Sequence, residues 1–277
     1  MSESRILTPL LGALLLGTPR SACAYRPFDG TDAAVTDTGM FELELGPAQY
    51  YRRAGNDYLI APAAVLNLGF AANLEAVIDL EQFIALEDVP GELRVRVLDT
   101  DALLKWVFLR GRLQDEHGLS AAIETGPLLP EIHGEDGLGF AANVIFSHAG
   151  SAGAAHLNTE AALSRLGNLE LFGSIILEAP RELTVRPVAE LFAEREFEEG
   201  STYSALAGAI WPASESFTFD GGIRFASEEG RAAIEVRGGV TWVATLWSAP
   251  PVLKARRARG SRPQVAQRDL PPARSRR

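Results

Sequence analysis

Residues 41–53 read FELELGPAQYYRR, and apolar and acidic side chains alternate through the first five positions. Successive side chains of a strand point to opposite faces, so Phe41, Leu43 and Leu45 share one face while Glu42 and Glu44 share the other. The same alternation returns in residues 74–81. A sheet with one face in water gives this pattern too, so an antiparallel sandwich or a lipocalin-like barrel is one interpretation of this stretch alone.

The amino-terminal residues have the features of a secretory leader. Arg5 precedes an apolar run over residues 6–17, and Ala-Cys-Ala ends the segment at Ala24, which predicts a signal peptide over residues 1–24. Lipidation of Cys23 is the alternative. Cleavage after Ala24 removes the single cysteine, so we expect no disulfide, thiolate nucleophile or cysteine metal ligand in the mature chain. No later run of about 18 apolar residues predicts a transmembrane helix.

Charge divides the rest of the chain. Residues 25–250 hold 34 acids and 15 bases, a net charge of −19, whereas residues 251–277 hold nine Lys or Arg and one Asp. We therefore predict a periplasmic lead-in over 25–40, a folded body over 41–250 and a disordered basic tail over 251–277. Such an acidic body is an unlikely partner for nucleic acid, but it does not repel cations or neutral and amphipathic solutes. The tail is expected to be solvated, with binding to anionic lipid or nucleic acid as the alternative.

About twelve alternating segments, each near ten residues long, cover residues 41–244 and are separated by Gly, Pro, Asn, Asp or charged clusters. An even number of such strands in an exported chain predicts an all-β fold, an antiparallel transmembrane β-barrel. Lipid offers no partners to backbone N–H and C=O groups, so a sheet that spans it must close on itself and turn its charges inward. The acidic face of residues 41–45 would then line a wet interior.

Strands far from the first repeat this division. His156, Asn158 and Glu160 fall on one face of their segment, and Asp220 and Arg224 fall opposite Phe219, Ile223 and Phe225. An excess of acids in the interior favours the passage of cations, whereas acids paired with bases favour an interior closed by a plug. A barrel of twelve strands suggests a narrow or plugged passage. The residues expected to line the interior and set selectivity are Glu42, Glu44, Glu75, Asp79, Glu81, Asp99, Asp101, Lys105, Glu124, His156, Asn158, Glu160, Arg186, Glu190, Asp220, Arg224, Glu235 and Arg237.

Three segments also resemble a known family. They are residues 28–44 (FDGTDAAVTDTGMFELE), 187–192 (PVAELF) and 219–225 (FDGGIRF). Together they are similar to the outer-membrane barrels associated with the meta-pathway of phenol degradation, often described as putative transporters. This resemblance implies a barrel that passes small, hydrophobic or aromatic compounds. In the usual barrel the last strand ends the chain with an aromatic residue that serves assembly. Here a long tail follows Trp242, and efficient membrane insertion is the expectation that this difference affects most.

Catalytic and cofactor motifs are weak. His156 is the histidine with polar company at strand spacing, and Ser147 on the preceding strand is its possible neighbour in a hydrolase. No histidine pair has a short metal-ligand spacing, and no phosphate-binding loop occurs, so we expect no metal, no cofactor and no enzyme activity.

We therefore predict a passive channel or transporter in the outer membrane of a Gram-negative bacterium. Its expected partners are outer-membrane lipids, the barrel assembly machinery and a small-molecule solute, with no nucleic acid. The alternatives are a plugged barrel with a structural or surface-interaction role and, less favoured, a membrane lipid hydrolase.

Overall fold

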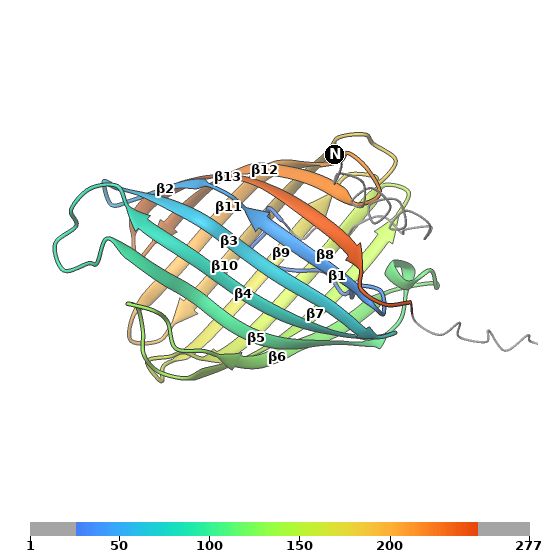
Figure 1. Ribbon diagram of the computed structural model, residues 1–277, viewed down its shortest axis with the longest axis horizontal. Coiled ribbons are helices and arrows are strands. Elements are labelled where there is room, and N and C mark those ends of the chain that lie inside the picture. The colour runs from blue at the N-terminus through green and yellow to red at the C-terminus, as the bar shows by residue number, and fades with distance from the viewer. Residues whose placement is uncertain (1–25, 249–277) are drawn as a thin grey trace, which may run out of the picture.

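The computed structural model describes residues 26–248, which form an all-β structure (Figure 1). The signal peptide predicted over residues 1–24 and the basic tail over 251–277 lie outside the described residues. The strands are β1 (Met40–Gly46), β2 (Gln49–Arg53), β3 (Asn56–Ala71), β4 (Leu74–Ala85), β5 (Val95–Leu109), β6 (Ser120–Leu128), β7 (Gly139–Gly150), β8 (Gly153–Leu163), β9 (Leu169–Glu178), β10 (Arg186–Glu196), β11 (Gly200–Pro212), β12 (Phe217–Glu228) and β13 (Arg231–Thr245).

The sheet closes on itself. From β3 to β13 each strand pairs antiparallel with its neighbour in sequence, and β1 and β2 both pair with β3 on one side and β13 on the other. Two short strands thus share one position in the wall. The result is a closed antiparallel barrel of twelve strands with one extra strand, which confirms the predicted fold class.

The shared position is broken where the sequence places Pro47. Proline has no N–H to donate to a sheet, so it interrupts a central strand. β1 ends at Gly46 and β2 begins at Gln49, and both keep one register against β3, with Gly46 opposite Ala63 and Gln49 opposite Ile60. The alternation of residues 41–53 therefore continues as two strands rather than one.

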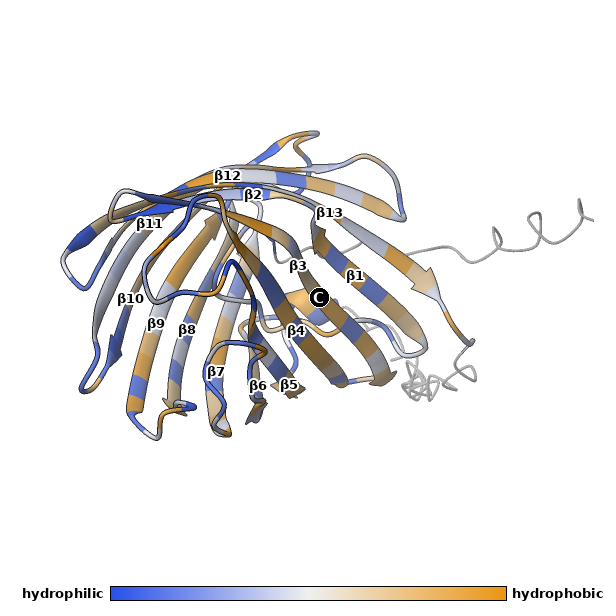
Figure 2. Cartoon of the chain, turned by 60° about the vertical axis from the view of Figure 1, so that its left-hand side comes forward, coloured by the Kyte–Doolittle hydropathy of each residue, from blue (hydrophilic) through white to orange (hydrophobic). Residues whose placement is uncertain are grey.

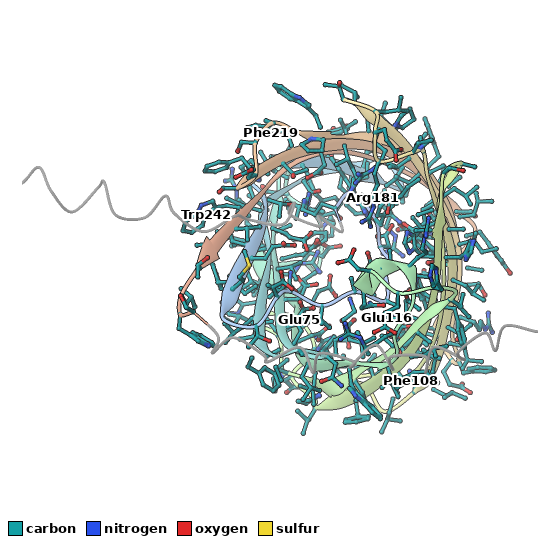
Figure 3. The ribbon with its side chains drawn as sticks, turned by 90° about the vertical axis from the view of Figure 1, so that its right-hand side faces the viewer. Glu75, Phe108, Glu116, Arg181, Phe219 and Trp242 are labelled. Carbon is teal, nitrogen blue, oxygen red and sulfur yellow. The ribbon has the colours of Figure 1, made fainter. Side chains whose placement is uncertain are left out.

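Outer and inner faces differ as the alternation predicts. On β8, β9 and β10 the outer row Leu157, Ile175 and Leu191 is in register, with 43%, 52% and 62% of these side chains exposed. Apolar and polar residues alternate along the strands in Figure 2. Seen along the barrel, Phe108, Phe219 and Trp242 point outward and Glu75 points inward (Figure 3).

The neighbouring aromatics Tyr50 and Tyr51 of β2 lie on opposite faces of the wall, because adjacent residues of a strand face opposite ways. Tyr50 is exposed outside, whereas Tyr51 is buried inside and donates a hydrogen bond from its hydroxyl to Glu228.

Helical structure among residues 26–248 is limited to one short turn, Arg112–Gln114. No helix in this part of the chain is long and apolar enough to cross a membrane. Within the same residues no group of three or more His, Cys, Asp or Glu side chains is placed to hold a metal ion.

Residues 26–38, which we call the inner segment, run inside the barrel before the chain enters β1. The sequence suggests a periplasmic lead-in over 25–40, yet the described part of it contacts side chains of the inner wall. At its end, Gly39 donates its N–H to the carbonyl oxygen of Gly69 on β3 at 2.7 Å. The interior is therefore partly filled by the chain's own backbone.

Candidate functional site

The candidate site is the barrel interior, with the inner segment crossing it. The residues expected to line it come from β1, β4, β5, β6, β8, β10, β12 and β13, and the wall turns them inward. Many are deeply buried there, including Glu44, Glu75, Lys105, His156, Asn158 and Glu190. Whether these residues set selectivity stays a prediction, but the structure shows which of them bind the inner segment and which face open space.

Arg26 ties the start of the described chain to the broken wall position. Its backbone N–H donates to Glu44 on β1 at 3.0 Å, and its guanidinium donates to Gln49 on β2 at 2.8 Å. Its Nε also lies 3.7 Å from a carboxylate oxygen of Asp220 on β12. A Cβ at Gly46 would lie only 2.6 Å from this guanidinium, so the absence of a side chain there makes room for Arg26.

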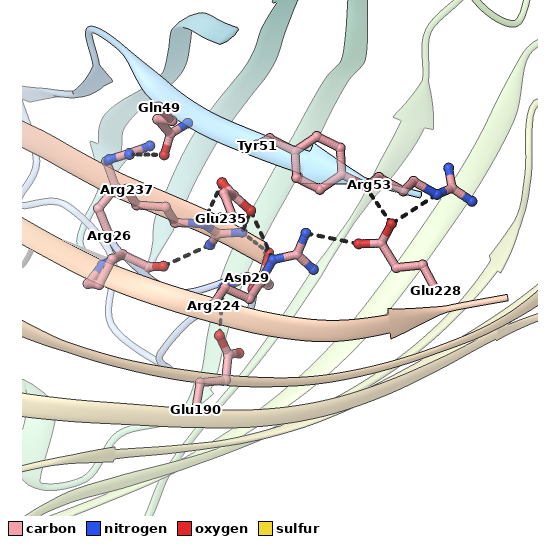
Figure 4. A network of polar contacts seen from close by, with 11 residues as sticks. Arg26, Asp29, Gln49, Tyr51, Arg53, Glu190, Arg224, Glu228, Glu235 and Arg237 are labelled. Carbon is pink, nitrogen blue, oxygen red and sulfur yellow. Dashed lines mark hydrogen bonds and ion pairs between the residues drawn. The ribbon is translucent and has the colours of Figure 1, made fainter. Parts of the chain in front are cut away.

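Asp29 and Gly30 are held by opposite walls. The Glu190 carboxylate on β10 accepts hydrogen bonds from the backbone N–H groups of both residues, each at 2.8 Å. From β13, Arg237 donates to the Asp29 carboxylate at 2.7 Å and to both oxygens of Glu235 (Figure 4). Charged groups thus fix the inner segment between β10 and β13.

The electrostatics of Asp29 follow from these neighbours. Burial opposes its ionisation, but the guanidiniums of Arg237 and Arg224 outweigh burial and hold the pKa of Asp29 below its ordinary value. Asp29 is therefore ionised at neutral pH and remains paired with Arg237.

Further along, hydrogen bonds attach the inner segment to β5 and β8. Asn158 accepts from the backbone N–H of Thr31 at 3.1 Å and donates to its carbonyl oxygen at 2.9 Å. Lys105 donates to the Thr31 hydroxyl at 2.8 Å. Closer to β1, the Thr36 N–H donates to the Glu75 carboxylate on β4. Side chains predicted for selectivity thus serve, in these cases, as anchors for backbone groups.

A serine, a histidine and a glutamate form a chain on β7, β8 and β9. Ser147 Oγ lies 2.8 Å from His156 Nδ1, and His156 Nε2 lies 3.0 Å from Glu178, which also contacts Arg186 at 2.9 Å. This order of groups is the one a hydrolase needs. Here, however, Ser147 and His156 are buried, and Ser147 accepts a hydrogen bond from Ala33 of the inner segment at 2.8 Å. The arrangement holds the inner segment and leaves the serine covered.

Open space remains beside the inner segment. A cavity of about 570 Å³ lies between it and the walls made by β2 to β5 and by β12 and β13. Residues of the inner segment from Arg26 to Thr31 border it on one side. Glu92 in the connection between β4 and β5, and Arg96 at the start of β5, border it elsewhere. A volume in this range suits a small organic ligand.

Sequence reasoning missed the role of the inner segment. Its composition, FDGTDAAV over residues 28–35, carries no periodicity that predicts a partner. One signal is Gly30, where an added Cβ would lie 2.4 Å from Ser174 Oγ and 3.0 Å from a Glu190 oxygen. A glycine marks this close approach of backbone to wall, but the wall is more than 100 residues away in sequence.

Neither a protein-family model nor a curated protein matches this sequence. Solved structures of outer-membrane barrels do match the fold. An outer membrane channel from Pseudomonas putida F1 is 8% identical, with a TM-score of 0.58 over 78% of this chain and 99% of that chain. The NanC porin is 7% identical, with a TM-score of 0.54 over 72% of this chain and 98% of that chain. At these identities the likeness shows the barrel fold, which resembles that of Gram-negative outer-membrane proteins, and a shared fold does not fix function.

Proposed function

We propose that this protein is an outer-membrane channel for the passive passage of small molecules, hydrophobic or aromatic compounds included, through an acidic interior. The observation that carries the proposal is the closed twelve-stranded wall with an apolar outer surface, a polar inner surface and a cavity inside. In a closed sheet the backbone N–H and C=O groups form hydrogen bonds with neighbouring strands. The apolar side chains on the outside then face the lipid.

Two further points support the proposal. The barrels of similar fold include structures described as a channel and a porin. The resemblance of residues 28–44, 187–192 and 219–225 to the phenol meta-pathway barrels favours aromatic solutes. In this proposal the outer row of Leu157, Ile175 and Leu191 contacts outer-membrane lipids, and the barrel assembly machinery inserts the signal-processed chain.

Planar-bilayer recording of the purified full chain tests the channel. We expect stepwise conductance and, in a KCl gradient, a reversal potential that favours K⁺ over Cl⁻, because acids outnumber bases around the cavity. Heat-modifiable migration of the same sample on a gel verifies that the barrel is folded. A folded, inserted barrel without conductance would contradict the proposal.

A plugged barrel with a structural or surface-interaction role is the second candidate. The observation in its favour is the inner segment, which bonds to the walls through Arg26, Asp29, Thr31 and Ala33. Deletion of residues 28–34 separates the two candidates. A channel already open in the native chain gains modest conductance, whereas a plugged barrel conducts only after the deletion.

A further inference from the structure

The cavity beside the inner segment has an unusual balance of charge. Nine of its lining residues are acids and six are bases. All six bases already have acidic partners: Arg26 with Asp220, Arg53 with Glu228, Arg96 with Glu92, Lys105 with Glu124, Arg224 with Glu235, and Arg237 with Asp29. The positive charges around the cavity are therefore neutralised before any solute enters.

Three acids on one wall form no ion pair at close range. They are Asp79 and Glu81 on β4 and Asp99 on β5; no base of residues 26–248 lies within ion-pair distance of them, and none of the three is fully buried. Asp101, which pairs with Asp79 in the strand register, is engaged by Arg165 at 2.6 Å. This wall consequently gathers carboxyl groups at the cavity that no basic side chain pairs with.

Apolar surface borders the same space. Phe28 of the inner segment and Phe83 of β4 line the cavity and are partly exposed, and Val77, Leu98 and Leu103 line it too. An inorganic cation gains nothing from these groups, whereas an organic cation with an aromatic body can bury its ring against them and place its ammonium near the carboxylates. The pairing of apolar walls with these acids therefore discriminates among solutes.

We propose that this cavity binds small aromatic or aliphatic ammonium ions, as the solute-binding site of the proposed channel. The inference rests on the proposed function for its biological role, but binding itself does not require conduction. Neutral aromatics of the same size lose the attraction of Asp79, Glu81 and Asp99, and carboxylate-bearing aromatics are repelled by them.

Isothermal titration calorimetry of the folded full chain in detergent tests the inference with three probes of matched shape. These are phenethylammonium, neutral 2-phenylethanol and anionic phenylacetate at pH 7, where the amine is protonated. We expect phenethylammonium to bind about tenfold more tightly than 2-phenylethanol, and phenylacetate more weakly than both. Equal binding of the cation and the neutral probe, or no binding of any probe, overturns the inference.

Matched variants locate the effect. The triple change Asp79→Asn, Glu81→Gln, Asp99→Asn should lower phenethylammonium affinity about tenfold and leave 2-phenylethanol unchanged. The control triple Glu170→Gln, Glu194→Gln, Glu196→Gln replaces the same number of acids, on β9 and β10, that do not line the cavity, and should lower phenethylammonium affinity less than twofold. Equal losses in the two triples would overturn the assignment to this cavity.

The apolar half of the site has its own test. Phe28→Ala should weaken phenethylammonium several-fold and leave methylammonium binding unchanged, since methylammonium has no ring to bury. If both probes weaken alike, the apolar contact is refuted. Heat-modifiable migration verifies the folding of every variant. Conductance of the native chain is measured separately. If the barrel conducts but fails these binding tests, this inference is wrong and the channel proposal stands. If the barrel binds the cation selectively but does not conduct, only the channel proposal is wrong.

Discussion

At the residue scale, the interior is organised by side chains that bind backbone. Glu190 accepts two N–H groups from residues 29 and 30, and Asn158 bonds both the N–H and the carbonyl of Thr31. A buried donor that loses its acceptor costs about 1 to 3 kcal/mol, so these few residues decide whether the inner segment stays bound.

Glu190→Ala should loosen the inner segment. The substitution removes the acceptor for the N–H groups of Asp29 and Gly30, of which the second is buried, and the expected cost is about 1 to 3 kcal/mol. Hydrogen exchange of these two amides should quicken in the folded barrel. Glu194→Ala, on the same strand but without a hydrogen bond or ion pair to the inner segment, is the control, and comparable exchange in both variants would argue against the anchor.

Asp29 makes the binding of the inner segment dependent on pH. Burial raises the pKa of Asp29, but Arg237 and Arg224 lower it below the ordinary carboxyl value of 3.8. The ion pair of Asp29 therefore stabilises the bound inner segment fully at pH values above 3.8. The contribution is lost as pH falls through the lower pKa of the bound state. Glu190 and Glu194 on β10 and Glu81 on β4 are acids whose charges also act on Asp29, and Glu235 shares the Arg237 guanidinium with it.

Asp29→Asn should therefore reduce the exchange protection of residues 29–31 at pH 7, and the gap from the native chain should be smaller at pH 3, below the ordinary carboxyl value of 3.8. Rates corrected for the intrinsic effect of pH are the measurement. A gap of the same size at both pH values would show that charge on Asp29 does not hold the inner segment.

At the element scale, the entry of the chain into the wall depends on close packing against β3. A Cβ on Gly69 would lie 2.1 Å from the carbonyl oxygen of Thr36 and 2.4 Å from that of Asp37. These are backbone atoms, which cannot move aside as a flexible side chain could. β3 thus supplies both a partner for β1 and a flat surface for the end of the inner segment.

Gly69→Ala should destabilise the barrel by about 1 to 3 kcal/mol, since it forces the backbone at Thr36 away from β3. Gly238→Ala is a matched control in β13, because nothing lies within 4 Å of its added Cβ. Urea midpoints in detergent report the difference. Equal midpoints for the two variants would mean that the inner segment can move away from β3 without a loss of stability.

At the scale of the whole molecule, the alternation of faces closes into a barrel whose outside is apolar and whose inside is charged. The cross-strand row of Leu157, Ile175 and Leu191 lies on the outside of three successive strands. In water such a surface would favour association with other apolar surfaces, while in a bilayer it is matched to its surroundings.

Ile175→Lys should destabilise the barrel in lipid vesicles by about 2 to 4 kcal/mol, the cost of a lysine facing lipid near the bilayer midplane. Ile132→Lys is the control, because Ile132 is equally exposed but lies in the connection between β6 and β7. Urea titration in vesicles measures both. A negligible effect at Ile175 would contradict the membrane-spanning assignment of β9.

The amino-acid sequence by itself determined the wall: the two-residue period of strands is a local property, so Phe41 and Glu42 already indicate which faces turn out and in. Only the tertiary structure decided what the interior contains. Asp29 meets Glu190 and Arg237 across 161 and 208 residues of sequence, and Ser147, His156 and Glu178 meet through the register of three strands. Such contacts depend on closure of the whole barrel, which no local period encodes. The same closure gathers Asp79, Glu81 and Asp99 at one wall of the cavity, with no base of the described residues at ion-pair distance.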